Sequence, residues 1–474
     1  MTRVHSFTDD ALSDLDGVGV ARAIATGEIS AREAAEAALA RIDAVDPQLR
    51  AVVHDDRARA LNRAGDLPVG VFRGVPSVIK NNTEFAGLPT RHGSAATADV
   101  PAKKNEPFTE QFLATGVNVL ATSSLPAFGF TATTEYDDRE PTCNPWHLEY
   151  SSGASSGGSA ALVAAGAVPI AHGNDGGGSI RIPAAACGLV GLKPTRGRVA
   201  PSAEGRMLPI DIISNGIMSR SVRDSAWFLA DIDRTFPAKK LPRVGLVEGP
   251  AKRRLRIGMV TDTITEAPLD ADSLAAVESV ATLLTELGHE VVPMDIPIDE
   301  SFIEDFTLYW SMLAWAIAAA PRLVMGRGFD ATRLDPFTSG LAGNFRGVRK
   351  GTVGAVRRLK AVEGQYRAVF EDLDLVLSPT LGHATPKLGH LSPTLPFDEK
   401  FRRLKDYVAF TPLNNVSGGP AISLPLAQNS AGMPLGIHFS ADLGDERTLL
   451  QIAYELEQAR PFARITDPAA VEAR

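Results

Sequence analysis

The sequence predicts an α/β protein: one large α/β/α domain whose central twisted sheet is mixed, mostly parallel and covered by helices. Short apolar, strand-like segments alternate with amphipathic, helix-like segments from residue 75 to residue 457. Residues 256–293 read as strand, helix and strand, which is typical of a right-handed parallel crossover. The strands are spread over the whole chain and no period of 20–50 residues repeats, which favours one sheet over separate modules.

The length of the chain allows more than one arrangement of domains. A chain of 474 residues corresponds to about three average domains, although large single domains occur. We expect residues 1–70 to form an N-terminal helical layer of the same domain, and residues 71–474 to form the α/β core. The charged, proline-bearing residues 237–252 are the best candidate for a break.

Residues 29–46 are expected to form a helix with a clear start. Ser30 and Glu33 match the S-x-x-E capping box, in which the two side chains satisfy amides at a helix N-terminus. Pro47 is expected to end this helix. A second helix is expected over residues 54–64.

The core elements follow from the same apolar periodicities. Strands are expected at residues 75–79, 117–122, 168–171, 256–260, 290–293, 373–377, 421–424 and 435–439. Helices are expected at residues 106–115, 221–230, 274–287, 302–320, 351–370 and 446–457. Residues 125–149 form a long connection, and connections of that length inside a domain are usually functional.

Composition excludes several classes of protein. Lys and Arg number 48 against 56 Asp and Glu, a net charge of −8, which argues against a nucleic-acid surface. Cys143 and Cys187 are too few for a disulfide framework and are expected to be small core residues. The N-terminus carries no secretory signal, and neither of the two low-charge stretches, residues 150–174 and 306–320, suits a membrane span. We therefore expect a cytoplasmic protein without metal or cofactor.

Residues 150–195 stand out from the rest of the chain. No formal charge occurs from residue 150 to residue 174, although charged residues make up 22% of the whole sequence, and Ser and Gly crowd both ends of the stretch. A flexible linker of this composition would not contain a core-forming run such as residues 160–168. The serines and glycines therefore indicate a backbone held close to something, with hydroxyl groups on display.

Short catalytic motifs give little support by themselves. Residues 77–80 match S-x-x-K, but the S-D-N and K-T-G partners of the β-lactamases are absent. Residues 153–157 match G-x-S-x-G, yet no apolar strand precedes them. Neither a phosphate-binding loop nor an H-E-x-x-H zinc motif occurs.

The segment Asp175-Gly-Gly-Gly-Ser179 carries more chemistry. Successive glycines allow backbone N–H groups to converge on an oxyanion, and a serine at their end is placed to attack the carbonyl group that they hold. A serine needs a base to remove its proton. No histidine stands in an obvious triad position, although His172 is close in sequence, and a second serine with a lysine is the alternative.

The sequence closely resembles the amidase signature family. The resemblance covers roughly residues 20–460 and is carried by several ordered motifs. These are G-V-P-x-x-x-K at residues 74–80, N-P-W at 144–146, G-x-S-S-G-G-S at 153–159, G-G-S-I-R-I-P-A at 177–184, C-G-x-x-G-L-K-P-T at 187–195 and N-x-S-G-x-P-A-I-S-L-P at 415–425.

The resemblance implies a Ser-cisSer-Lys triad. Ser179 is the nucleophile, Ser155 is the bridging serine that follows a cis peptide bond, and Lys80 is the base. The oxyanion hole comprises the backbone N–H groups of Gly176, Gly177, Gly178 and Ser179. The implied reaction is acyl transfer to Ser179 followed by hydrolysis, which requires Lys80 to be uncharged near neutral pH. Burial disfavours the charged form of a lysine.

Two residues depart from the family pattern. Asn81 replaces the aspartate that usually follows the lysine, which removes a charge near Lys80. Gly176 replaces a larger residue and is expected to widen the glycine-rich turn. Neither departure touches the triad.

The resemblance also bears on the substrate. The segment Ile180-Arg-Ile-Pro183 differs from the I-R-Q-P of amidotransferase A subunits, and other segments are similar to hydrolases of 6-aminohexanoate cyclic oligomers, aryl acylamides and carbamates. We expect a monomer or homodimer that cleaves small-molecule amides, carbamates or nylon oligomers. An amidotransferase A-type subunit and an inactive scaffold stay open as alternatives. Residues 306–315 either line an apolar substrate pocket or form a core helix, and the second interpretation is favoured.

Overall fold

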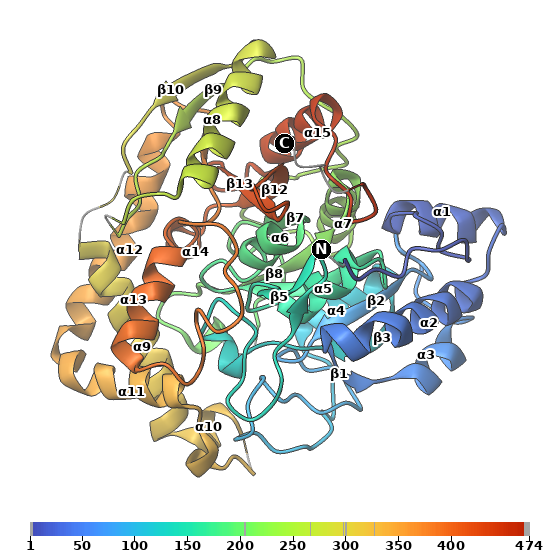
Figure 1. Ribbon diagram of the computed structural model, residues 1–474, viewed down its shortest axis with the longest axis horizontal. Coiled ribbons are helices and arrows are strands. Elements are labelled where there is room, and N and C mark those ends of the chain that lie inside the picture. Colours follow the sequence, from blue (N-terminus) through green and yellow to red (C-terminus); the bar gives the residue numbers. More distant parts are fainter. Residues whose placement is uncertain are drawn as a thin grey trace.

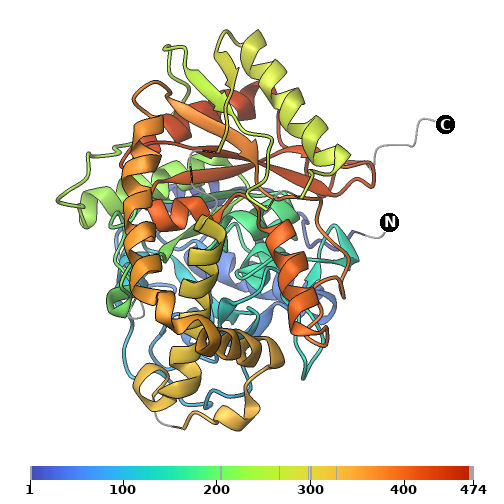
Figure 2. The same ribbon diagram turned by 90° about the vertical axis from the view of Figure 1, so that its left-hand side faces the viewer.

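An eight-stranded mixed sheet crosses the molecule and carries helices on both faces (Figures 1 and 2). The computed structural model describes residues 3–202, 205–265, 267–296, 298, 301–326 and 328–468. The strand order in the large sheet is β10-β9-β11-β13-β12-β7-β8-β6. Its strands are β6 (Ile170–Asp175), β7 (Val190–Lys193), β8 (Ser214–Ser219), β9 (Arg256–Met259), β10 (Glu290–Pro293), β11 (Leu375–Pro379), β12 (Ala421–Gln428) and β13 (Pro434–Ser440).

The prediction of a mixed sheet is confirmed, but the prediction that it is mostly parallel is wrong. Strand β9 pairs in parallel with β10 and with β11, whereas every other neighbouring pair described in this sheet is antiparallel. Two connections explain the difference. A short turn joins β12 to β13 as a hairpin. Strand β8 lies between β6 and β7, whereas the sequence, in which one helix separates β6 from β7, suggests that those two strands are neighbours.

A smaller sheet, with the order β1-β3-β2, lies beside the edge strand β6. Its strands are β1 (Val52–Asp55), β3 (Asn118–Ser123) and β2 (Pro76–Lys80). Side chains rather than a backbone ladder join β2 to β6: Ser77 Oγ donates to the Ile170 carbonyl at 2.9 Å, and the Lys80 N–H donates to His172 Nδ1 at 3.2 Å. The ends of β2 and β6 are thereby held side by side. A separate two-stranded ribbon consists of β4 (Cys143–Asn144) and β5 (His147–Ser151).

The N-terminal segment is only partly as expected. Helix α2 (Ala31–Leu49) has the predicted capping box of Ser30 and Glu33, but it continues past Pro47. The missing N–H of a proline costs one hydrogen bond in the last turn. Asp46 Oδ1 ties the following backbone to this turn by accepting the N–H groups of Ala51 and Val52. The predicted helix 54–64 is wrong at its start, because His54 belongs to β1, which pairs with β3, and α3 covers only Arg57–Arg63.

The remaining helices follow the prediction in part. Helices α4 (Pro107–Ala114), α7 (Val222–Thr235), α8 (Ala271–Glu286), α9 (Ser301–Ala319), α12 (Thr352–Val369) and α15 (Glu446–Ala459) correspond to predicted helices. Helices that the periodicities missed are α1 (Gly17–Thr26), α5 (Gly157–Ala164), α6 (Arg181–Cys187), α10 (Pro321–Val324), α11 (Pro336–Val348), α13 (Phe397–Tyr407) and α14 (Pro412–Ser417). Helices α8 and α15 lie on one side of β12 and β13, and α6 and α14 on the other (Figure 2).

One large cluster of buried apolar side chains contains residues from most of the chain. It includes Val18 and Ala38 of the N-terminal helices, Ile170 of β6, and Val277 of α8. The division at residue 70 into a helical layer and a core stays a prediction. Residues 237–252, expected as a break, contribute Val244 and Val247 to this cluster.

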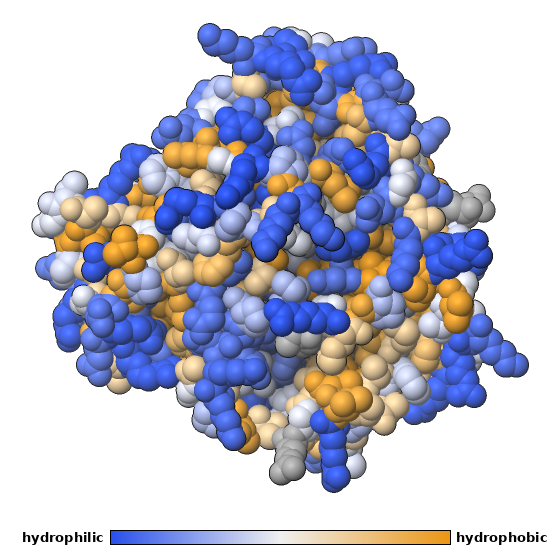
Figure 3. All heavy atoms as spheres, turned by 180° about the vertical axis from the view of Figure 1, so that it is seen from behind, coloured by the Kyte–Doolittle hydropathy of each residue, from blue (hydrophilic) through white to orange (hydrophobic). Residues whose placement is uncertain are grey.

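Hydrophilic side chains cover much of the face opposite to that of Figure 1, with apolar ones interspersed among them (Figure 3). In the described part of the chain, no helix has both the length and the apolar character that crossing a membrane requires.

The packing of α8 against the sheet gives a test of the core. Leu284 is fully buried, so Leu284→Ala is expected to lower the free energy of unfolding by about 2–5 kcal/mol, because the cavity left behind does not refill. Leu323→Ala, at a position 82% exposed, is the matched control and is expected to change it by less than about 0.5 kcal/mol. Urea unfolding followed by circular dichroism compares the two, and equal losses would contradict this view of the core.

Candidate active site

The predicted base lies at the end of β2, where the smaller sheet meets β6. Lys80 is fully buried, and its Nζ lies 2.7 Å from Ser155 Oγ and 2.6 Å from Asn174 Oδ1. Asn174 is the penultimate residue of β6, and its Nδ2 donates to Asn82 Oδ1 at 3.0 Å. The amine is therefore held by a side chain from the end of β6 and by a serine that precedes α5.

Ser155 precedes α5, and the peptide bond between Ala154 and Ser155 is cis, as the resemblance implied. The backbone of Gly129 passes directly over this hydroxyl group: a Cβ atom at residue 129 would lie 2.9 Å from Ser155 Oγ. A glycine is therefore needed where the long connection 125–149 approaches the bridging serine.

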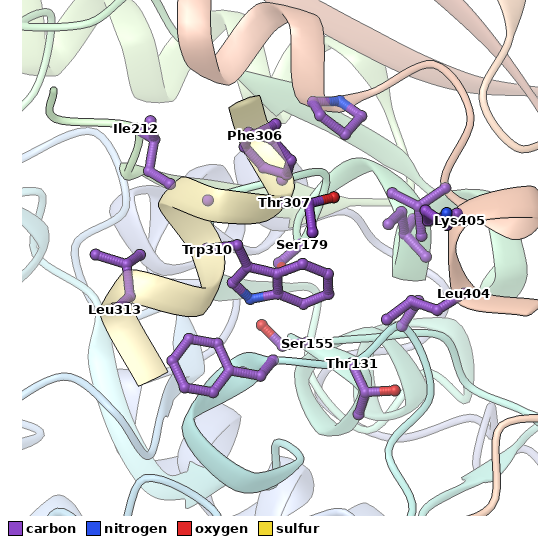
Figure 4. A pocket seen from close by; sticks show the side chains of 18 of the residues that line it. Thr131, Ser155, Ser179, Ile212, Phe306, Thr307, Trp310, Leu313, Leu404 and Lys405 are labelled. Carbon is purple, nitrogen blue, oxygen red and sulfur yellow. The ribbon is translucent and has the colours of Figure 1, made fainter. Parts of the chain in front are cut away.

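Ser179 lies in the turn between β6 and α6. Its carbonyl oxygen accepts hydrogen bonds from Ser156 Oγ at 2.6 Å and from the Ser156 N–H at 3.3 Å. Ser179 and Ser155 line the same cavity, and their side chains lie close together at its base (Figure 4). The structure thus brings Lys80, Ser155 and Ser179 together from three distant segments.

The carboxylate of Asp175 organises the glycine turn. Asp175 Oδ1 accepts from the Gly178 N–H at 2.7 Å, and Oδ2 accepts from the Ile180 N–H at 3.1 Å. Thr411 Oγ1 donates to the Gly177 carbonyl at 2.6 Å, so the peptide unit between Gly177 and Gly178 is held at both ends.

These contacts correct one part of the predicted oxyanion hole. The N–H of Gly178 is already used by Asp175 inside the turn, and Gly178 is absent from the described lining of the cavity. Gly176 and Gly177 do line the cavity. The sequence does not distinguish the successive glycine amides. In the turn, the Gly178 N–H points to Asp175, whereas Gly176 and Gly177 line the cavity.

Asp175 is held by a fully buried ion pair with Arg181, the first residue of α6. The closest nitrogen–oxygen distance is 2.9 Å, and Arg181 also donates to Asn414, Asn415 and His438. Burial alone would raise the pKa of Asp175, but the Arg181 charge and the hydrogen bonds from Arg181 and Asn415 hold it well below its usual range. The carboxylate is therefore ionised at neutral pH.

His172 is excluded as the general base. Its Nδ1 accepts from the Lys80 backbone N–H at 3.2 Å, so Nε2 carries the proton and faces Asn215 Oδ1 at 3.2 Å. Burial lowers the pKa of His172 to about 3, and its ring packs on Phe108 with the ring centroids 4.9 Å apart. A neutral, enclosed imidazole positions the lysine backbone and leaves proton transfer to other groups.

The cavity above the serines is largely apolar. The aromatic side chains that line it are Phe128, Phe130, Phe302, Phe306 and Trp310. Helix α9 forms one wall with Phe306, Thr307, Trp310 and Leu313, and α13 forms the facing wall (Figure 4). The favoured interpretation of residues 306–315 as a core helix is thus wrong for one face of α9, while Tyr309 on the other face is fully buried.

Comparison with known proteins agrees with this geometry. The family model Amidase matches residues 33–450. The chain belongs to the amidase family. It is 46% identical to the "Putative amidase AmiC" of Mycobacterium tuberculosis over 100% of both chains. It is 34% identical to the 6-aminohexanoate-cyclic-dimer hydrolase of Paenarthrobacter ureafaciens, over 94% of this chain and 95% of that protein.

Solved structures of this family share the fold. A 6-aminohexanoate cyclic dimer hydrolase complexed with substrate aligns with a TM-score of 0.86 at 30% identity, over 96% of this chain and 98% of that one. A bacterial aryl acylamidase of the amidase signature family aligns with a TM-score of 0.82 at 26% identity, over 94% and 96% of the two chains. The protein is accordingly a hydrolase that acts on amide C–N bonds.

In the described ranges, no three His, Cys, Asp or Glu side chains gather as a metal ion would require, and both cysteines are buried without a disulfide. The cytoplasmic location and the state as monomer or homodimer stay predictions.

The two departures from the family pattern have a structural explanation in this amidase. Asn81 Nδ2 donates to the Pro89 carbonyl at 2.9 Å and to Thr122 Oγ1 at 3.0 Å, while its Oδ1 accepts from the Arg91 N–H at 2.7 Å. An aspartate would lose both donors, so Asn81 braces the following loop. Gly176 faces open space, where an added Cβ would meet only Ile213, at 3.7 Å.

The glycine turn gives a matched pair of substitutions. Gly178 has φ +130°, and a Cβ there would overlap Thr411 Oγ1 and Ile182, so Gly178→Ala is expected to lower the melting temperature by several degrees. Gly176→Ala has room and is expected to shift it by less than about one degree. Differential scanning fluorimetry compares the two, and similar shifts would show that the turn is not held as described.

His172 predicts a pH dependence of stability. Its pKa is about 3 when folded and about 6.5 when unfolded, so below pH 6.5 only the unfolded chain takes up the proton and stability falls. Between pH 7.5 and 5.5 this one group removes about 1.4 kcal/mol. His172→Asn keeps an acceptor for the Lys80 N–H and is expected to lose that part of the pH dependence in urea unfolding, whereas the exposed His5→Asn is expected to retain it. Unchanged pH dependence in His172→Asn would refute a buried neutral imidazole.

Proposed function

We propose that this amidase cleaves its substrate through an acyl-enzyme formed on Ser179, with Ser155 as the proton relay and Lys80 as the base. The observation that carries the proposal is the hydrogen bond of 2.7 Å between Lys80 Nζ and Ser155 Oγ at the base of the cavity that Ser179 also lines. Lys80 itself is absent from the described lining, so it reaches the reacting centre through Ser155.

The partners of the amine suit an uncharged lysine. The carbonyl oxygen Asn174 Oδ1, 2.6 Å away, accepts only, so it takes an N–H of Lys80. A neutral amine then keeps one lone pair, and a hydroxyl group such as that of Ser155 can donate to it. Ser155 in turn accepts the proton of Ser179, which turns a weak nucleophile into an alkoxide-like one.

The reaction then proceeds in two balanced halves. Ser179 Oγ bonds to the amide carbon, and the N–H groups of Gly176, Gly177 and Ser179 receive the negative oxygen. The C–N bond breaks as the proton held by Lys80 returns through Ser155 to the leaving nitrogen, which departs as the amine. A water molecule, activated by the same relay, then attacks the ester carbon. The bond to Ser179 Oγ breaks, which releases the acid and restores Ser179.

The cavity favours a substrate with a large apolar part. Phe128, Phe130 and Trp310 offer contact to an aryl group or an extended alkyl chain above the scissile bond. Related proteins are named for a cyclic amide dimer and for aryl acylamides, and both compounds are of this kind. We therefore propose aryl amides, carbamates and cyclic or linear aminoalkanoate oligomers as the substrates to test first.

The alternative of an amidotransferase A-type subunit is less suited to this cavity. Ile182, which replaces the glutamine of the I-R-Q-P segment, contributes its side chain to the apolar lining. The likeness to the solved amidotransferase subunit, at 24% identity and a TM-score of 0.69, concerns the fold alone.

Steady-state kinetics on 4-nitroanilides, phenyl carbamates and cyclic aminohexanoate oligomers tests the triad. Ser179→Ala and Lys80→Met are expected to lower kcat/KM by at least about a thousand-fold, and Ser155→Ala nearly as much, because the three groups act as a unit. The exposed Ser430→Ala and Lys252→Met are matched controls and are expected to retain activity.

Two outcomes would overturn the proposal. Near-normal turnover by folded Ser179→Ala would remove the acyl-enzyme. A wild-type protein that hydrolyses nothing in the panel would remove the proposed substrate classes.

A further inference from the structure

The active-site cavity contains one ionised side chain among the described residues that line it, and that side chain is a cation, Lys405 of α13. Its other polar groups, such as those of Asn82, Thr131 and Thr307, are uncharged. Figure 4 shows Lys405 on the wall that faces α9, away from Ser155.

Lys405 is held beside the aromatic part of the cavity. Its Nζ lies 5.2 Å from the centroid of the Phe401 ring, and that ring is 6.0 Å from the ring of Trp310, which lines the cavity. A cation over an aromatic face is attracted to it, so the contact restricts the lysine to the neighbourhood of the cavity wall.

The other cations of α13 differ from Lys405 in their surroundings. Arg402 and Arg403 form ion pairs with Asp406 and Glu399, one turn away on the same helix. Lys405, in contrast, has no carboxylate within ion-pair distance among the residues that the structure describes.

Lys400, over the Phe337 ring at 4.7 Å, is a useful comparison on the same helix. Burial lowers its pKa to about 8, against the opposing effect of Asp335, Glu135 and Asp137. Its charge is thus matched by nearby acids, whereas the charge of Lys405 remains available to a ligand.

We propose that Lys405 binds a carboxylate on the substrate, remote from the scissile amide, and so selects amides that carry a terminal acid. The inference rests on the proposed function and adds the substrate class: acylated amino acids or ω-carboxyalkyl amides with an apolar body between the acid and the amide. An unpaired carboxylate in an apolar cavity is costly to desolvate. A lysine at the wall offsets that cost for an acid, and it raises the cost for an ammonium group.

Matched substrates test the proposal without identifying the natural one. One series contains 4-nitroanilides of straight-chain acids whose far end is a carboxylate, a hydroxymethyl or an aminomethyl group. A second series carries the same three groups on the amine side of the scissile amide. The wild-type enzyme is expected to favour the carboxylate over the hydroxymethyl compound in at least one series, through KM rather than kcat, with the aminomethyl compound last.

Variants of Lys405 assign the preference to this side chain. Lys405→Met is expected to lower the ratio of kcat/KM for the carboxylate over the hydroxymethyl compound about ten-fold, and Lys405→Glu to reverse the order toward the aminomethyl compound. Lys405→Arg is expected to restore most of the ratio. Arg402→Gln, an exposed position on the same helix that is absent from the described lining, is the control and is expected to leave the ratio unchanged.

Ionic strength gives an independent readout. Because salt screens a partly exposed charge, the wild-type ratio is expected to fall between 20 and 500 mM salt, and the ratio of Lys405→Met is not. No preference for the acid in either series, or a preference that survives Lys405→Met, would overturn the inference while leaving the triad intact. If the wild-type enzyme hydrolysed no compound of either series, that result would instead count against the proposed function.

Discussion

The buried ion pair between Asp175 and Arg181 is the constraint on which the site depends. Asp175 ends the strand that positions Asn174, and its carboxylate fixes the amide of Gly178 on the way to Ser179. Arg181 links this turn to Asn414, Asn415 and His438. Burial and the nearby Arg181 charge lower the pKa of His438 well below its usual range, so this imidazole accepts a hydrogen bond as a neutral group. Because a buried charge left without its partner costs about 3–5 kcal/mol, the network tolerates little displacement.

The two halves of the site use different physics. The floor of the cavity is a polar network in which Lys80, Ser155 and Asn174 have fixed partners at 2.6–2.7 Å. This network orients the polar groups before any substrate arrives. The walls of the cavity, from α9 and α13, are mostly apolar side chains that recognise shape (Figure 4). In the mechanism and the specificity that we propose, this polar network performs the hydrolysis, while the walls and Lys405 select the amide. Substrate preference can therefore change without disturbing the catalytic groups.

The sequence predicts the elements of this site better than their connections. Lys80, Ser155 and Ser179 stand in long ordered motifs, and the structure brings all three together. The sequence does not reveal the role of Asn174. This residue lies in the same uncharged run as His172, but no local pattern pairs it with a lysine 94 residues away. The occupied amide of Gly178 and the hydroxyl of Thr411 depend on tertiary contacts, which periodicity does not contain. The sheet was predicted as mostly parallel for a similar reason: alternation of helices and strands does not reveal that β8 inserts between β6 and β7.

The mechanism that we propose requires a neutral Lys80 that activates Ser179 through Ser155. Labelling with a fluorophosphonate, followed by peptide mapping in a mass spectrometer, tests this most directly because the reagent needs the activated serine but no particular substrate. We expect one adduct, on Ser179, and a labelling rate at least about a hundred-fold lower in Lys80→Met than in the wild type. An adduct on any other residue, or labelling of Lys80→Met at the wild-type rate, would contradict the account.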